Sequence, residues 1–125
     1  MRTGLLRAVG TATALYGLAV AARPHLLASP SGLTDRHGDT HPDVAASLRP
    51  LGWRDAASGL AMALAPEGPA LRLATAVRIA ADLGDAALLG GTLPDRRRRA
   101  KVVAVSVGWA SLSVAGLLTT PRDRR

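Results

Sequence analysis

Residues 102 to 120 read VVAVSVGWASLSVAGLLTT and contain no charged side chain. As a helix they would extend roughly 28 Å, close to the thickness of the hydrocarbon core of a bilayer. Basic residues stand on both sides, with residues 96–99 and Lys101 before the segment and Arg122, Arg124 and Arg125 after it. Lys and Arg flank membrane helices because their charges remain in the headgroup region. The segment is therefore predicted to span a membrane.

The composition of the chain favours a membrane protein over a nucleic-acid-binding one. Its 125 residues carry 16 Lys and Arg against 9 Asp and Glu, a formal net charge of +7, and 48% of them are hydrophobic. Nucleic-acid-binding surfaces combine basic with aromatic side chains, and none is aromatic near the arginine run at residues 96–99. We therefore expect no nucleic-acid partner. Cysteine is absent, which excludes disulfides, thiolate metal sites and a cysteine nucleophile.

Proline and glycine divide the rest of the chain into apolar segments. Pro24 ends the first segment, because proline disfavours helical geometry in the residue before it. The second ends at residues 66–69, Pro-Glu-Gly-Pro, which are typical of a tight turn, and residues 90–91, Gly-Gly, end the third. No segment alternates as a β-strand does. We predict one all-α domain over residues 1–125, a four-helix transmembrane bundle with helices at 5–22, 51–65, 69–91 and 102–120.

The segments between these helices are polar or basic. We expect a polar loop over residues 29–43, a basic loop over 95–101 and a basic C-terminal tail over 121–125, and residues 44–49 could add a short helix. His37 and His41 stand four residues apart in the polar loop, and imidazoles at such spacing can bind zinc. The glycine and proline beside them disfavour the helix that would align them. A solvated loop is expected, with no metal and no cofactor.

Charged residues inside the second and third helices form the candidate site. Arg78, Asp82 and Asp85 fall on one face of the third helix, and Arg54 and Asp55 open the second. Each charge at the centre of an inserted helix costs about 2.5–3.5 kcal/mol unless it is paired in the interior. The short turn between the helices requires an antiparallel hairpin, which places Arg54 at the depth of Asp82 or Asp85. Asp55 and Arg78 are near neighbours in the same register.

Two roles are open for this intramembrane Arg/Asp cluster. Its ion pairs could only hold the hairpin together, or they could relay protons or ions, because ionisable residues inside membranes are often functional. In the second case Asp82 and Asp85 would carry the activity. Catalysis is not expected, because the serines lack a nucleophile elbow and no phosphate-binding glycine loop is present.

Small residues at helical spacing predict where the helices pack. Such faces let helix backbones approach closely in lipid, where hydrophobic burial between helices contributes little. The predicted faces are Gly10, Ala14 and Gly17 in the first helix and Ala104, Gly108 and Ser111 in the fourth.

The N-terminal segment also has features of a secretory signal. Arg2 and Arg7 could form its basic region, residues 8–18 its apolar region and residues 19–21, Ala-Val-Ala, its cleavage site. A cleaved chain would start near Ala22 and lie outside the cytoplasm. We expect instead that the segment is retained as a membrane helix.

The basic residues also bear on orientation. The first and third loops hold eight of them: Arg23, Arg36, Arg49, Arg96, Arg97, Arg98, Arg99 and Lys101. The opposite side holds five: Arg2, Arg7, Arg122, Arg124 and Arg125. Because cytoplasmic loops carry the excess of Lys and Arg, this distribution favours both termini outside the cytoplasm.

Several of these residues together resemble a known group of proteins. Residues 52–55, Gly-Trp-Arg-Asp, followed by Gly59, form a Gly-x-Arg-Asp-x-x-x-Gly motif that opens the second helix. Residues 15–17, Leu-Tyr-Gly, precede Pro24 in the first segment, and the third helix carries Arg78 with its two aspartates. The pattern is similar to an uncharacterised family of small bacterial four-helix integral membrane proteins, a domain of unknown function. The resemblance implies a plasma-membrane protein and transfers no activity.

The sequence therefore predicts a small multi-pass protein of the plasma (inner) membrane with a structural or accessory role. The lipid bilayer is its expected partner, together with a membrane-protein partner or a second copy of the chain. One alternative is a small proton-coupled transporter that uses Asp82 and Asp85. Another is a soluble basic helical protein, or a secreted one with a cleaved signal, because a mean hydropathy of +0.17 is low for four spans.

Overall fold

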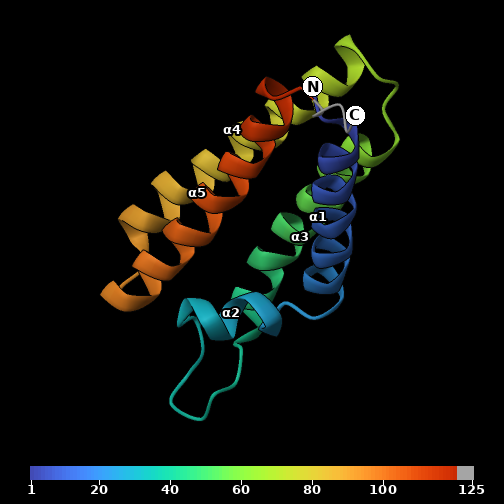
Figure 1. Cartoon of the computed structure of the whole chain (residues 1–125). Coiled ribbons are helices and arrows are strands. Elements are labelled where there is room, and N and C mark those ends of the chain that lie inside the picture. The colour runs from blue at the N-terminus through green and yellow to red at the C-terminus, as the bar shows by residue number, and fades with distance from the viewer. Residues whose placement is uncertain (121–125) are drawn as a thin grey trace.

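The computed structural model describes residues 1–120, and over these residues the protein is all-α, without strands (Figure 1). The predicted tail at residues 121–125 lies outside the described residues. The helices are α1 (Thr3–Ala22), α2 (His25–Ser31), α3 (Pro42–Leu64), α4 (Pro69–Thr92) and α5 (Arg96–Leu118). The described chain thus has five helices where four were predicted, because the seven-residue α2 follows α1 directly.

The predicted start of the second helix, at residue 51, is wrong, because α3 already begins at Pro42. A proline at the first helical position needs no amide hydrogen and has its φ angle preset for the helix. The side chain of His41 caps the same turn by accepting a hydrogen bond from the Asp43 amide. Pro50 removes one backbone donor from α3 but does not end the helix.

The predicted loops are correspondingly shorter than expected. The polar loop does not fill residues 29–43, because α2 takes its first three residues and α3 its last two. The basic loop at 95–101 is wrong, since the arginine run forms the first turn of α5. The Asp95 carboxylate accepts hydrogen bonds from the amides of Arg97 and Arg98, at 2.9 and 3.2 Å, and so caps the helix.

Helices α1 and α3 pack against each other through glycines. A Cβ atom at Gly10 would lie 2.7 Å from the carbonyl oxygen of Gly59, and one at Gly52 would lie 2.7 Å from that of Gly17. Ala14 is buried between these two contacts. Since real Cβ contacts are longer than this, the backbones touch where side chains would normally separate them. Gly10, Ala14 and Gly17, the predicted small face of α1, therefore lie in this contact.

The predicted small face of α5 is wrong. Ala104, Gly108 and Ser111 are exposed, and the buried face of α5 is formed by Ala110, Ser113 and Gly116. Alanine, serine and glycine occur on several sides of this helix, so their spacing could not select the packed side.

Helices α4 and α5 form a second pair, which diverges from the α1–α3 pair toward the end of the molecule where α2 lies (Figure 1). At the opposite end the pairs meet around an apolar cluster of Leu6, Val9, Met62 and Leu71. There the amide of Arg2 also donates to the carbonyl oxygen of Gly116, at 2.7 Å. The two helix pairs are thus in contact at one end of the molecule and separated at the end where α2 lies.

Two helices of the described chain, α1 and α5, are long and apolar enough to cross a membrane. Helices α3 and α4 do not meet that criterion. The prediction of four spans is therefore supported directly for two helices only.

Candidate functional site

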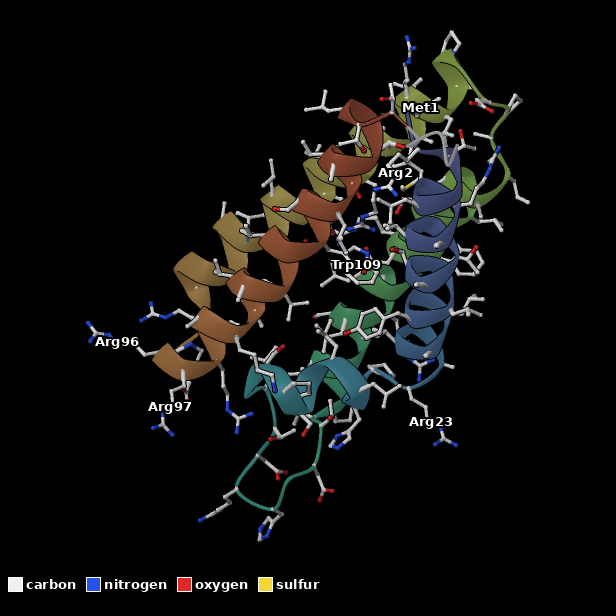
Figure 2. All side chains as sticks on the ribbon, viewed as in Figure 1. Met1, Arg2, Arg23, Arg96, Arg97 and Trp109 are labelled. Carbon is white, nitrogen blue, oxygen red and sulfur yellow. The ribbon has the colours of Figure 1, made fainter. Side chains whose placement is uncertain are left out.

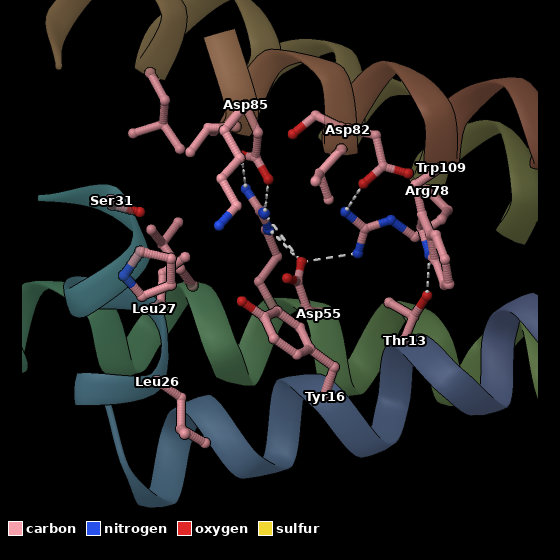
Figure 3. A pocket seen from close by; sticks show the side chains of 18 of the residues that line it. Thr13, Tyr16, Leu26, Leu27, Ser31, Asp55, Arg78, Asp82, Asp85 and Trp109 are labelled. Carbon is pink, nitrogen blue, oxygen red and sulfur yellow. Dashed lines mark hydrogen bonds and ion pairs between the residues drawn. The ribbon is translucent and has the colours of Figure 1, made fainter. Parts of the chain in front are cut away.

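The side chain of Arg54 joins α3 to the middle of α4. Its two terminal nitrogens donate to the two carboxylate oxygens of Asp85, at 2.9 and 2.7 Å (Figure 3). The same guanidinium also donates to Asp55 Oδ1, from Nη2 at 2.9 Å and from Nε at 3.2 Å. The planar guanidinium fork matches a carboxylate in this two-point geometry, which fixes orientation as well as adding attraction.

The side chain of Arg78 makes the second connection between these helices, from α4 back to α3. Its Nη1 donates to Asp55 Oδ1 and to Ser58 Oγ, both at 2.8 Å, and its Nη2 donates to Asp82 Oδ1 at 2.6 Å. Only 1% of the Arg78 side chain is exposed, and it is the largest fully buried side chain of the described residues. Asp55 accepts hydrogen bonds from both arginines and so joins the two connections into one network.

The structure thus brings the five sequence-predicted site residues together in a continuous series. We refer to Asp85, Arg54, Asp55, Arg78 and Asp82, in that order of contact, as the Arg/Asp network. Of the two partners predicted for Arg54, the structure pairs it with Asp85. Three carboxylates and two guanidiniums leave the network itself with one excess negative charge.

Sequence reasoning missed Ser58 as a member of this site. It stands four residues after Arg54 and three after Asp55, so all three share one side of α3. Its hydroxyl accepts a hydrogen bond from Arg78 and donates to the carbonyl oxygen of Asp55, at 3.3 Å. The helical spacing of Ser58 from Arg54 and Asp55 is the sequence signal that could have identified it as a site residue.

The Arg/Asp network forms one wall of a cavity of about 480 Å³ between the two helix pairs (Figure 3). Tyr16 of α1 and Trp109 of α5 stand on its other walls, and the Trp109 indole N–H donates to Thr13 Oγ1 at 2.7 Å. Most of the apolar lining comes from α2, α3, α4 and α5, and it includes Leu26, Leu27, Leu51, Leu89, Val102 and Val105. Such a cavity, apolar with a few convergent polar groups, is typical of small-molecule sites.

Two buried polar atoms on this lining have no hydrogen-bond partner: Asp82 Oδ2 and Ser31 Oγ. The residues themselves are 5% and 2% exposed. Arg78 Nε is a third such atom, within the network. Buried polar atoms in folded proteins are nearly always paired, so each of these is a place where a bound molecule or a water would be stabilised.

The histidines lie away from this cavity. His25 is hydrogen-bonded to Thr40 at 2.7 Å, and His41 caps α3. Over residues 1–120 no group of three or more His, Cys, Asp or Glu side chains is arranged to hold a metal ion.

The fold and the site together define an all-α protein with a charged network in its interior. No family model matches the chain, and neither does any curated protein or solved structure. The resemblance to small bacterial four-helix membrane proteins therefore stays a prediction that depends on the sequence motifs alone.

Proposed function

We propose that the chain is a small integral membrane protein of structural or accessory function. In this proposal α1, α3, α4 and α5 cross the bacterial plasma (inner) membrane, and the Arg/Asp network holds α3 and α4 together inside the bundle. The observation that carries the proposal is the combination of large apolar side chains on the surface of the helices with a charged network in the interior.

Large apolar side chains cover the outside of the helices. Most of the surface of Leu15, Leu64, Leu73, Val77, Leu88 and Leu118 is exposed, and the exposed fraction reaches 79% at Leu118. Meanwhile Arg78 and Asp82 are almost fully buried. In water, apolar residues are favoured inside and charges outside. In a bilayer the apolar surface contacts lipid, and ionisable side chains face the interior of the bundle and pair there.

The same distribution accounts for the low apolarity of α3 and α4. Their charges would oppose insertion if each helix entered lipid alone, but the Arg/Asp network pairs them within the hairpin. The glycine contact between α1 and α3 supports the proposal independently, because membrane helices associate through small residues that let backbones approach.

The ends of the molecule carry basic side chains, as the ends of membrane helices do. Arg23, Arg96 and Arg97 extend from the end that bears α2, and Met1 and Arg2 lie at the other (Figure 2). The larger number of basic residues near the α1–α3 and α4–α5 connections supports an orientation with both termini outside the cytoplasm. Reporter fusions after Thr120 and in the loop at residues 33–41 test this orientation. We expect activity of a periplasmic reporter only at the C-terminal position.

Membrane placement is tested by fractionation of cells that express the chain. We expect it in the membrane pellet after an alkaline carbonate wash, which releases peripheral proteins. Recovery in the soluble fraction would contradict the proposal and support the soluble basic protein. N-terminal sequencing of the same fraction is part of the test, because a start near Ala22 would identify a cleaved signal. Proteins that co-purify in mild detergent would identify the partner of an accessory protein.

The second candidate function is proton-coupled transport, which is favoured by the position of Asp82 and Asp85 on the wall of the cavity. A pH-driven flux assay in liposomes tests it. Flux that is lost in Asp82→Asn and Asp85→Asn would support transport, and no flux above that of empty liposomes would exclude it under those conditions.

A further inference from the structure

We propose that the cavity beside Asp82 binds a hydrophobic primary amine in its ammonium form. This goes beyond a structural role, because it assigns a ligand class to a cavity that membrane placement leaves without one. It does not depend on that placement either, since binding is measured on the purified protein in whichever medium it is soluble.

The unpartnered oxygen of Asp82 determines the kind of ligand atom. One oxygen of this carboxylate is joined to Arg78, and the other, Oδ2, is buried without a partner on the cavity lining (Figure 3). A carboxylate oxygen accepts hydrogen bonds, so the group that completes it must be an N–H or O–H donor. Among donors, a cation forms the shorter and stronger hydrogen bond to a carboxylate.

The charge of the surrounding network selects a cation over a neutral donor. The two arginines pair with three aspartates, which gives one excess negative charge, and the Asp82 end of the network is buried. A buried charge without a counter-charge is costly, so a ligand with one positive charge would balance the network. Lys101 also lines the cavity, but its residue is exposed and it forms no ion pair with the network.

The remaining walls fit the apolar part of such a ligand. Leucine and valine side chains of α2, α4 and α5 face the same space, and the rings of Tyr16 and Trp109 stand beside it. The hydrogen bond from Trp109 to Thr13 holds the indole in place. An ammonium group near the face of an aromatic ring gains further attraction, which is strongest for tryptophan. At about 480 Å³ the cavity has the size of an ordinary small-molecule site.

Three probes of one shape and different charge test the proposal: 1-adamantylamine, 1-adamantanol and adamantane-1-carboxylate. The amine is protonated at neutral pH, as a lysine side chain is. Binding is followed by tryptophan fluorescence in a Trp53→Phe background, where Trp109 on the cavity wall is the remaining tryptophan of the two. Equilibrium dialysis in the same neutral detergent measures the affinity independently.

We expect the amine to bind at least about ten-fold more tightly than the alcohol, the ratio that corresponds to one hydrogen bond to a charged group. The carboxylate should bind more weakly than either. Asp82→Asn should remove most of the preference for the amine, because the amide is neutral. Lys101→Gln should tighten binding of the amine about two-fold by removing a like charge at the cavity. Ser106→Phe should abolish binding of all three probes by filling the space, while leaving the Arg/Asp network intact.

Equal affinity for amine and alcohol would overturn the proposal, and so would tighter binding of the carboxylate or no binding at all. An unchanged preference in a folded Asp82→Asn protein would do the same. If that variant does not fold, Lys101→Gln and Ser106→Phe decide the question, because neither residue belongs to the network. Recovery of the protein in the soluble fraction would contradict membrane placement without affecting this titration, so the two failures are distinguishable.

Discussion

The two long contacts of α3 are made by different chemistry on different sides of the helix. Toward α1 it presents Gly52 and Gly59, and the contact is one of backbone against backbone. Toward α4 it presents Arg54, Asp55 and Ser58, and the contact is a series of charge-assisted hydrogen bonds. The contact with α1 requires that the glycines have no side chains. The contact with α4 requires that every hydrogen-bonding partner is present.

The two contacts are therefore sensitive to opposite kinds of substitution. Added volume disrupts the glycine contact, because neither backbone can move away from a new side chain. Loss of one partner disrupts the network, because a buried charge is then left unpaired. Four substitutions test the comparison, from the largest expected effect to the smallest.

Arg78→Met should be the most destabilising, by about 3–5 kcal/mol of unfolding free energy, because it leaves Asp55 and Asp82 with a buried excess of negative charge. Equilibrium unfolding in detergent measures the effect. Arg72→Met is the matched control on α4, since Arg72 is exposed. A similar loss of unfolding free energy in both variants would indicate that stability depends on the total charge of α4 and not on the Arg/Asp network.

Gly17→Val should lower the unfolding free energy by about 3 kcal/mol, at the upper end of the range for overpacking. Its Cβ atom would lie against the backbone of Ala56 and 2.5 Å from the carbonyl oxygen of Gly52. Thermal unfolding followed by circular dichroism measures the loss. If the variant were as stable as the parent protein, the close contact of α1 with α3 would be wrong.

Asp82→Asn should lower stability by about 1 kcal/mol, since the amide oxygen still accepts from Arg78 but the lost ionic attraction to this buried guanidinium outweighs the relief of the excess negative charge. Membrane insertion should be unchanged, because the substitution removes a charge. The midpoint of thermal unfolding and the amount in the membrane fraction are measured together. An unchanged midpoint would count against a stabilising role for this part of the network.

Gly108→Ala should have the smallest effect and should not lower stability; we expect a gain of about 0.5–1 kcal/mol, because alanine is favoured over glycine inside a helix. Gly108 is exposed on α5, and no neighbouring atom lies within 4 Å of where its Cβ would be. The same melting experiment as for Gly17 compares the two glycines directly. A large loss at Gly108 would show that the opposite face of α5 is packed, as the sequence had suggested.

The sequence allowed the hairpin and its charged residues to be predicted because the signals are local. The proline turn at residues 66–69 determines that α3 and α4 are antiparallel, and helical spacing then sets which charges share a depth. The partners of Gly10 and Gly17 were not predicted, since residues far apart in the chain make that contact. The packed side of α5 was missed for a related reason, because composition alone does not distinguish its faces.

The errors at the helix ends had a different origin. Asp95 before the arginine run is an ordinary N-cap, but the run was interpreted through its charge and assigned to a loop. The predicted short helix at residues 44–49 and the second helix from residue 51 are separated at Pro50, although a helix that packs on both sides can lose one backbone hydrogen bond and continue.

The glycine contact between α1 and α3 has a consequence for the order of synthesis. A ribosome completes α1 before it starts α3, and residues 23–41 separate the two helices. The glycine face of α1 must therefore stay unmatched until α3 is made. The Arg/Asp network waits for a shorter stretch of chain, because residues 65–68 alone separate α3 from α4. The charges of α3 therefore gain their partners on α4 soon after synthesis, whereas the glycine face of α1 stays unmatched for longer.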